Sequence, residues 1–145
     1  MVLLVHHADA LAAHIDAQRP LSAHGLEQAE RLAAEVTSRG FAPAAIWHSG
    51  KMRGRQTAEA FLRICNPFAE FKMVRGLRSE DAPEWMRDEL FAELRDMLLV
   101  GHMPNIADLA RLMAATTTAF PLHGAIALER NGEARTWTEA WRVQP

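Results

Sequence analysis

Apolar residues along this chain fall into short continuous runs, and longer segments with helical spacing separate them. Several runs have the length and composition of β-strands; they cover residues 2–5, 44–48, 71–74, 97–100, 125–129 and 135–141. The run at 2–5 is apolar throughout, as in a strand that is covered on both faces. Asn131 and Gly132 lie between the last two runs and predict a hairpin.

The segments between these runs have apolar residues three and four positions apart, which is the spacing of one helix face. The expected faces are Leu26, Ala29, Leu32, Ala33 and Val36; Ala58, Phe61, Leu62 and Cys65; Trp85, Leu90 and Leu94; and Ile106, Leu109, Ala110 and Met113. Ser22, Ser49 and Asn105 are placed to cap the first, second and fourth of these helices. Asp81 and Glu84 resemble a capping box at the start of the third.

Strands and helices therefore alternate along the chain, which favours an α/β fold with a mainly parallel sheet. The hairpin near the end adds an antiparallel edge, so we expect a mixed sheet. The 145 residues suit a single domain, residues 1–145, with a core large enough to fold without disulfides.

Composition and charge narrow the function classes. Apolar residues make up 49% of the chain and charged residues 23%, so the composition is that of an ordinary globular protein. The formal net charge of −2 offers no basic face for nucleic acid. No apolar run approaches the roughly 20 residues that a membrane span needs, so we expect no membrane insertion.

Two further features bear on the compartment. The apolar start of the chain stops at His6 and has no basic segment before it, so it does not predict a signal peptide. Cys65 is the only cysteine, which excludes an intrachain disulfide. Both features favour a reducing compartment, and we expect a cytoplasmic protein.

Candidate chemical groups follow three of the predicted strands. His7 follows the first strand, residues 49–53 follow the second, and His102 follows the fourth. In open α/β sheets, ligands bind outside the carboxyl ends of the strands. We therefore expect these groups to converge on one site, although they lie far apart in the sequence.

Four segments resemble the motifs of the histidine phosphatase superfamily, the phosphoglycerate-mutase-like enzymes with an Arg-His-Gly motif. These segments are residues 5–10 (VHHADA), 19–25 (RPLSAHG), 49–58 (SGKMRGRQTA) and 99–104 (LVGHMP). The family motifs are Arg-His-Gly, Arg-Pro-Leu-Thr…Gly, Ser-Pro-x-x-Arg-Ala-x-Gln-Thr-Ala and Val-Gly-His-x-Pro. The resemblance covers nearly the whole chain and is nearest to the small phosphohistidine phosphatases of the SixA type. It implies a three-layer αβα sandwich with a mainly parallel, mixed central sheet.

The resemblance also implies a covalent reaction that needs no cofactor and no metal. His7 matches the nucleophile, which attacks phosphorus and becomes phosphohistidine before water releases phosphate. Arg53 matches a phosphate-binding arginine, and His102 matches the second histidine of the site. The other expected phosphate-binding residues are His6, Arg19 and Ser49. A neutral imidazole is a fair nucleophile near pH 7, and a transferring phosphoryl group needs cations around it.

The sequence departs from the family motifs at His6, which stands in place of the arginine, at Ala8, in place of the glycine, and at Gly50, in place of the proline. Arginine binds two phosphate oxygens with a planar fork, whereas histidine gives at most one donor to them. Losing such a clamp typically costs about 10²–10³ in rate. Lys51, His48 and Arg19 are candidates to compensate for it.

Glu80 lies in the stretch where many relatives place a carboxylate, and it is our candidate for a general acid. Glu80 and Asp81 also have the residue types of a helix start. We expect the remaining histidines His14, His24 and His123 to lie on the surface, and Trp85 to take part in packing.

The leading hypothesis is a phosphatase, specifically a phosphohistidine phosphatase, that acts on a phosphorylated protein or a small phosphorylated substrate. The alternative is a phosphate- or phosphoprotein-binding module, in which His6 leaves weak turnover or none. A third hypothesis is a metal-dependent hydrolase that uses His6, His7, Asp9 and His102. The short chain leaves little room for an inserted lid, so we expect an open site.

Overall fold

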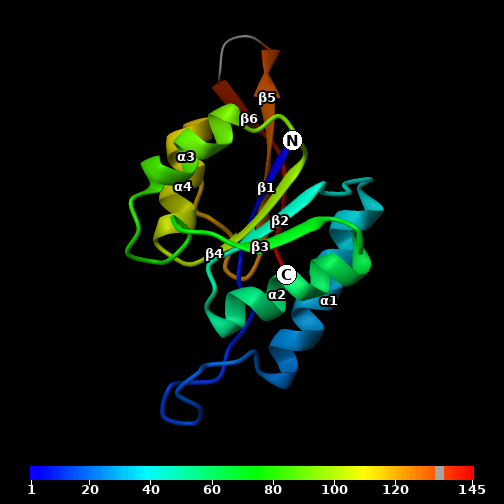
Figure 1. Cartoon of the computed structure of the whole chain (residues 1–145), viewed down its shortest axis with the longest axis vertical. Helices are drawn as coiled ribbons and strands as arrows, with labels where there is room; N and C mark the ends of the chain where they lie inside the picture. The colour runs from blue at the N-terminus through cyan, green and yellow to red at the C-terminus, as the bar shows by residue number, and fades with distance from the viewer. Residues whose placement is uncertain (133–135) are drawn as a thin grey trace.

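A computed structural model describes residues 1–132 and 136–145 and shows a central sheet with helices on both faces (Figure 1). The elements in chain order are β1 (Val2–His6), α1 (Ala23–Ser38), β2 (Ala45–His48), α2 (Met52–Ile64), β3 (Glu70–Met73), α3 (Pro83–Ala92), β4 (Met97–Gly101), α4 (Asn105–Ala114), β5 (Ala125–Asn131) and β6 (Thr136–Val143). The predicted alternation of strands and helices is confirmed. None of the helices in the described ranges is long and apolar enough to cross a membrane.

The described strands form one sheet in the order β3-β2-β4-β1-β5-β6. The pairs β3–β2, β2–β4 and β4–β1 are parallel, whereas β5 is antiparallel to both β1 and β6. The predicted mixed sheet and its antiparallel edge are therefore confirmed. Asn131 at the end of β5 pairs with Thr136 at the start of β6. Arg135, the predicted first residue of the last strand, lies outside the described residues.

Successive residues of the central strands face opposite layers, which explains why these strands are apolar throughout. In β1, Leu3 and Val5 pack in one core cluster with Phe61 of α2. Leu4 packs in a second cluster with Leu109 of α4. Figure 1 shows α1 and α2 on one side of the sheet and α3 and α4 on the other. The molecule is thus the expected three-layer αβα sandwich.

The start of α1 holds the preceding loop in place. The predicted cap is confirmed, because Ser22 Oγ accepts a hydrogen bond from the Gly25 N–H at 2.9 Å and donates one to the Asp9 carboxylate at 2.6 Å. A Cβ atom at position 25 would lie 1.9 Å from the Asp9 carbonyl oxygen, so only glycine fits there. This contact anchors the loop that carries Arg19.

The other predicted caps are wrong, because each polar side chain binds a loop residue instead of the start of its helix. Ser49 lies within hydrogen-bond distance of His102, and α2 begins after Lys51. The Asp81 carboxylate accepts two backbone N–H groups from the loop before α3. Asn105 Nδ2 donates to the Asp81 carbonyl oxygen at 2.8 Å. The side chains that local sequence assigns to helix starts thus hold together the loops at the carboxyl end of the sheet.

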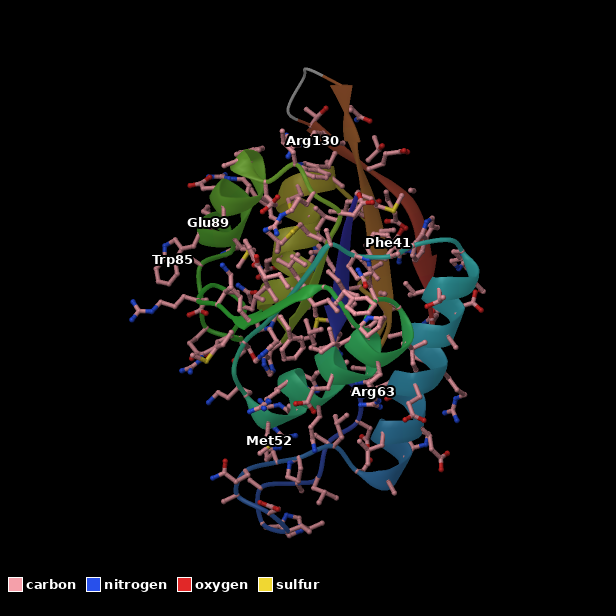
Figure 2. The ribbon with its side chains drawn as sticks, turned by 45° about the vertical axis from the view of Figure 1, so that its right-hand side comes forward. Phe41, Met52, Arg63, Trp85, Glu89 and Arg130 are labelled. Carbon is pink, nitrogen blue, oxygen red and sulfur yellow. The ribbon has the colours of Figure 1, made fainter. Side chains whose placement is uncertain are left out.

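Some residues of the predicted helix faces are exposed. Trp85 is 58% exposed, Leu94 is 81% exposed, and Leu26 is 47% exposed. Helix α3 ends before Leu94, and it turns Met86 and Leu90 toward the sheet in place of Trp85. Figure 2 shows Trp85 pointing outward from α3. The indole is therefore available on the surface and does not stabilise the core.

Candidate active site

Three neighbouring strands bring the predicted chemical groups together. Strands β2, β4 and β1 are adjacent and parallel, so their carboxyl ends lie side by side. The rings of His7 and His102 are 4.8 Å apart between centroids. Ser49 Oγ lies 2.6 Å from His102 Nε2. The expected convergence of the strand ends is therefore present in the structure.

His7 presents a neutral imidazole with a defined tautomer. Its Nδ1 lies 2.8 Å from the Ala8 carbonyl oxygen. Because a carbonyl only accepts, Nδ1 carries the proton and Nε2 keeps its lone pair. Burial lowers the pKa of His7 to about 4. The hydrogen bond to Ala8 raises the pKa and the Arg53 charge lowers it, but burial has the largest effect. His7 is thus unprotonated at Nε2 at neutral pH, as a nucleophile must be.

His102 lies deeper, at the end of β4. It is 3% exposed, and burial followed by the charge of His7 lowers its pKa to about 3. Its Nε2 is held by Ser49, whose Oγ also accepts the Lys51 N–H at 3.2 Å. Its Nδ1 is buried and has no hydrogen-bond partner among the residues of the two described ranges. Such an atom can bind an oxygen of a ligand in the site.

Arg53 lies in the first turn of α2. Its Nε is buried and finds no acceptor within the described part of the chain. A buried donor without an acceptor costs free energy, and a phosphate oxygen is a strong acceptor for a guanidinium. A Cβ atom at Gly54, the next residue, would lie 3.5 Å from His102 Nε2, so this turn of α2 lies against the histidine, and the Arg53 charge lowers the pKa of both His7 and His102. The start of α2 adds backbone N–H groups that favour an anion.

Two of the three candidate compensating groups act on the pKa values of the histidines. Arg19 lowers the pKa of His7, Arg53 and His102, and its Nε donates to the Leu11 carbonyl oxygen at 3.0 Å. Lys51 lowers the pKa of His102. The site is therefore cationic although the whole chain is not.

His48, the third candidate, has a different role. Its ring packs against Phe71 with centroids 4.9 Å apart, and its Nδ1 accepts the Gly50 N–H at 3.1 Å. The charged groups that act on its pKa are Arg55 and Glu59, on the outer part of α2. His48 thus supports the loop after β2 and does not replace the motif arginine.

His6 occupies the last position of β1, where the family motif has arginine. Its Nδ1 accepts the His123 N–H at 2.9 Å, so the proton of the neutral ring is on Nε2. Burial, with a further contribution from His7, lowers the pKa of His6 to about 3. The rings of His6 and His7 are 4.4 Å apart. His6 therefore offers one neutral donor beside the nucleophile and no charge.

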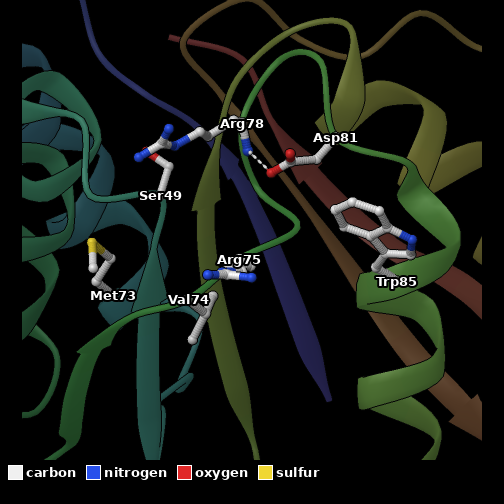
Figure 3. Close-up of a pocket in the computed structure, with 7 residues that line it drawn as sticks. All are labelled: Ser49, Met73, Val74, Arg75, Arg78, Asp81 and Trp85. Carbon is white, nitrogen blue, oxygen red and sulfur yellow. Dashed lines mark hydrogen bonds between the residues drawn. The ribbon is translucent and has the colours of Figure 1, made fainter.

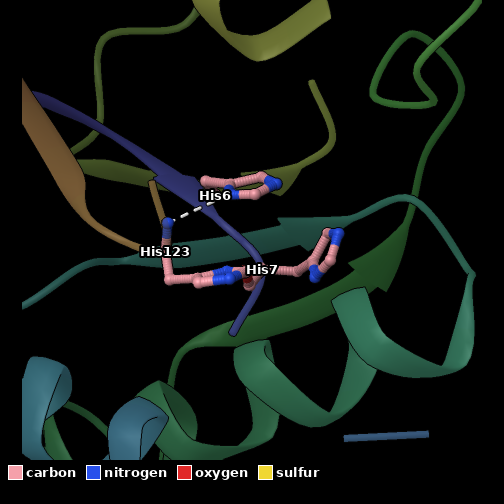
Figure 4. A group of neighbouring side chains, drawn as sticks. All are labelled: His6, His7 and His123. Carbon is pink, nitrogen blue, oxygen red and sulfur yellow. Dashed lines mark hydrogen bonds between the residues drawn. The ribbon is translucent and has the colours of Figure 1, made fainter. Parts of the chain in front are cut away.

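His123 is the site residue that sequence reasoning missed, since we expected it on the surface. Figure 4 shows its ring beside those of His6 and His7. It stacks on His6 with centroids 5.0 Å apart and planes 10° apart, and its Nδ1 lies 2.7 Å from the His7 carbonyl oxygen. No local sequence pattern marks this position, because the pairing of β5 with β1 is what brings residue 123, just before β5, to the end of β1.

The predicted metal-binding set is not the one that the structure assembles. Nitrogens of His6, His7 and His123 lie within 4.8 Å of one another, which is close enough for a shared metal ion. Asp9 instead accepts a hydrogen bond from Ser22 at the start of α1. Within the cluster, His6 has one nitrogen protonated and the other bonded to a backbone N–H, so it offers no lone pair for a metal.

Glu80 is exposed at the edge of the site. Its carboxylate accepts a hydrogen bond from Ser79 Oγ at 2.9 Å, and that bond holds the pKa of Glu80 below its ordinary value. A general acid needs a raised pKa, so that it still holds its proton near pH 7. We therefore leave Glu80 out of the proposed machinery.

Acidification is expected to destabilise the fold through these buried histidines. In the unfolded chain they take up protons near a pKa of 6.5, whereas His6, His7 and His102 in the folded chain have values of about 3 to 4. The unfolded state therefore binds more protons as the pH falls below 6.5, and stability decreases. From pH 7 to pH 5, urea titration should show a loss of about 2 kcal/mol for each histidine that stays neutral.

Two variants test this explanation, one at a histidine of the site and one, as the control, at a histidine outside it. Replacing His102 with asparagine should reduce the pH dependence, and replacing the exposed His14 with asparagine should leave it unchanged. A free energy of unfolding that is equal at pH 7 and pH 5 would show that the histidines are not held neutral.

A cavity of about 610 Å³ adjoins the site through Ser49 (Figure 3). Its lining residues are Ser49, Met73, Val74, Arg75, Arg78, Asp81 and Trp85. Gly50 has a φ of +85°, and a Cβ atom there would lie 2.3 Å from the Met73 sulfur. Glycine in place of the proline of the family motif thus allows Met73 to form a wall of this cavity.

The sequence matches the histidine phosphatase superfamily (branch 1) over residues 2–99. The chain belongs to this superfamily. A comparison with curated proteins gave no match. The fold of this histidine phosphatase is similar to that of the protein histidine phosphatase SixA complexed with tungstate, at a TM-score of 0.88 and 20% identity, with 99% of this chain and 96% of that chain covered.

A second similar structure is a protein assigned as the phosphohistidine phosphatase SixA of Agrobacterium tumefaciens. It has a TM-score of 0.84 and 26% identity, and the alignment covers 99% of this chain and 97% of that chain. The resemblance that the four sequence segments carry is thus confirmed, together with the phosphoglycerate-mutase-like fold. At the position of the motif arginine this chain has His6, whose ring stacks on that of His123.

Proposed function

We propose that this histidine phosphatase hydrolyses phosphohistidine through a phosphohistidine intermediate on its own His7. The observation that carries the proposal is the His7 ring, which is held by the Ala8 carbonyl so that the lone pair of Nε2 is free. Arg53 supports it with a guanidinium whose buried Nε has no acceptor in the described ranges. A nucleophile beside an unsatisfied phosphate donor is what phosphoryl transfer requires.

In the first step, oxygens of the phosphoryl group bind Arg53, the Nε2–H of His6 and the ring of His102. The lone pair of His7 Nε2 attacks phosphorus while the bond to the leaving nitrogen breaks, and that nitrogen takes up a proton from solvent. In the second step a water molecule attacks phosphorus, the bond to His7 Nε2 breaks, and inorganic phosphate leaves. The cations stabilise the charge of the transferring group in both steps.

The leaving group favours phosphohistidine over a phosphate ester. The nitrogen of a phosphoramidate is protonated readily, so the reaction does not need a strong acid from the protein. The carboxylate nearest in the sequence to a family acid, Glu80, has a lowered pKa. The similar folds that are named as phosphohistidine phosphatases also support this substrate.

The cavity next to the site supports a phosphorylated protein as the substrate. Met73 and Trp85 are 65% and 58% exposed at its wall, and Arg75 and Arg78 are exposed beside them. Methionine, tryptophan and arginine are enriched in protein–protein interfaces. The two arginines also favour acidic side chains next to the phosphohistidine.

The test of the proposed function uses peptides of one sequence that carry phosphohistidine or phosphoserine. We expect kcat/KM for phosphate release from phosphohistidine to be at least about 10²-fold higher, which is what a missing general acid costs an ester. Binding of both peptides without phosphate release would contradict the proposal and would favour a binding module. Equal turnover of both peptides would contradict the choice of phosphohistidine.

The residues around the phosphohistidine are expected to matter as well. A phosphohistidine peptide flanked by glutamates should have a KM about tenfold lower than one flanked by lysines. The double variant Arg75→Gln/Arg78→Gln should lose this preference. The matched control, Arg31→Gln/Arg63→Gln, removes the same charge from exposed arginines of α1 and α2 and should keep it. Equal KM values for the two peptides on the unaltered protein would contradict an acidic protein partner.

A further inference from the structure

His123 connects the two histidines at the end of β1. Its backbone N–H donates to His6 Nδ1 at 2.9 Å, and its ring Nδ1 donates to the His7 carbonyl oxygen at 2.7 Å. The dashed line in Figure 4 marks the first of these bonds. The same residue therefore holds the ring of His6 and is itself anchored on the main chain of the nucleophile.

The backbone of His123 has a conformation that favours glycine. Its φ is +54°, in the left-handed region that residues other than glycine adopt uncommonly, although Asn, Asp and His adopt it more often than the rest. The loop enforces this conformation, because the Gly124 N–H donates to the Pro121 carbonyl and the His6 N–H donates to the Gly124 carbonyl. A non-glycine residue held in this way is a mark of function when its side chain faces a site.

The ring of His123 also fixes the orientation of the His6 ring. The two rings are nearly parallel, 10° apart, with centroids 5.0 Å apart. His6 is 4% exposed, so its other face is enclosed as well. With Nδ1 bonded to the backbone of residue 123, the Nε2–H of the His6 ring has no partner among residues 1–132 and 136–145.

We propose that His123 is a positioning residue that makes His6 a replacement for the arginine of the family motif. This inference rests on the proposed function, because it concerns the same phosphate site. A guanidinium carries its donors in a rigid plane, whereas an imidazole has one donor that must be aimed. His123 aims it in two ways: its N–H sets the tautomer of His6, and its ring holds the plane of His6.

The test is a double-mutant cycle between His6→Arg and His123→Gly. Glycine at position 123 keeps the backbone N–H, suits the left-handed φ and removes only the ring. With His6 present, we expect His123→Gly to lower kcat/KM for a phosphohistidine peptide about tenfold. With His6→Arg, which should itself raise turnover, we expect His123→Gly to change kcat/KM by less than about twofold.

Two variants separate positioning from a merely structural role. His123→Gly should stay folded with an unfolding temperature close to that of the unaltered protein, because relief of the strained φ offsets the lost hydrogen bond to the His7 carbonyl. His123→Asn should retain more activity than His123→Gly, because asparagine tolerates the left-handed region and its amide can donate to the His7 carbonyl. His14→Gly, at an exposed position, is the matched control and should leave kcat/KM unchanged. Equal losses from His123→Gly in both His6 and His6→Arg proteins would overturn the inference.

Binding of inorganic phosphate keeps this test independent of turnover. If the unaltered protein binds phosphate without hydrolysing the peptide, the proposed function fails. The inference then stands if His123→Gly weakens phosphate binding about tenfold and does so only when His6 is present. Phosphate affinity that is equal in the unaltered protein and in His123→Gly would overturn it.

Discussion

Replacement of His7 with asparagine is expected to lower turnover of a phosphohistidine peptide by at least about 10³-fold. The asparagine amide is close in size to the imidazole and can still donate a hydrogen bond to the Ala8 carbonyl. It has no lone pair that attacks phosphorus at neutral pH, so the covalent step is lost. The measurement is the rate of phosphate release at saturating peptide.

The control for this variant separates chemistry from folding. His7 is only 9% exposed, so circular dichroism and thermal unfolding must show that the variant is folded. The same change at His14, which is exposed, should leave turnover unchanged. A folded His7→Asn protein that keeps a tenth of the activity would contradict a nucleophilic role for His7.

Replacement of Arg53 with methionine should lower kcat/KM about 10²–10³-fold, because a charged clamp on the transferring group is lost. The expected effect on stability is different. Arg53 Nε is buried without an acceptor among the described residues, and burial lowers the pKa of the guanidinium. Methionine fills similar space without a buried donor, so the free energy of unfolding should stay equal or rise.

Arg55 supplies the matched control, because it lies two residues further along α2 and points outward. It forms an exposed ion pair with Glu59, with Nε and Oε1 2.9 Å apart. Arg55→Met removes the same charge from the same helix and should change turnover by less than about twofold. Similar losses from both variants would show that general charge at α2, and not the Arg53 contact, supports catalysis.

The strands and the site residues His7, Arg53 and His102 could be predicted because they depend on local patterns and on motif positions. The apolar runs at β1 and β4 read directly as buried strands, and each is followed directly by a histidine that the motif marks, His7 and His102. Arg53 lies at the start of a helix that follows a strand, which is where an anion site forms. These features need no knowledge of distant contacts.

The helix caps could not be predicted, because tertiary contacts decide them. Ser49, Asp81 and Asn105 are good capping residues by type, but Ser49 and Asn105 bind residues of other loops, and Asp81 binds backbone N–H groups of its own loop. Local propensity does not contain these partners, since Ser49 and His102 are 53 residues apart. All three residues lie at the carboxyl end of the sheet, next to the site, and their side chains bind loop residues there.

His123 could not be predicted because its role depends on backbone geometry. Its residue type, between Pro121 and Gly124, is that of a loop position. Only the strand order places it beside β1, and only its positive φ turns its N–H and its ring toward His6 and His7. The tautomers of His6 and His7 likewise follow from their hydrogen-bond partners and not from the sequence.

The central claim is a covalent phosphoryl intermediate on His7. The most direct measurement mixes the protein with a phosphohistidine peptide, quenches the reaction in alkali within milliseconds, digests the protein and locates phosphate by mass spectrometry. The account predicts an acid-labile phosphate on the fragment that contains His7, and none there in His7→Asn. Turnover without phosphate on His7, or with phosphate on His102 instead, would contradict it.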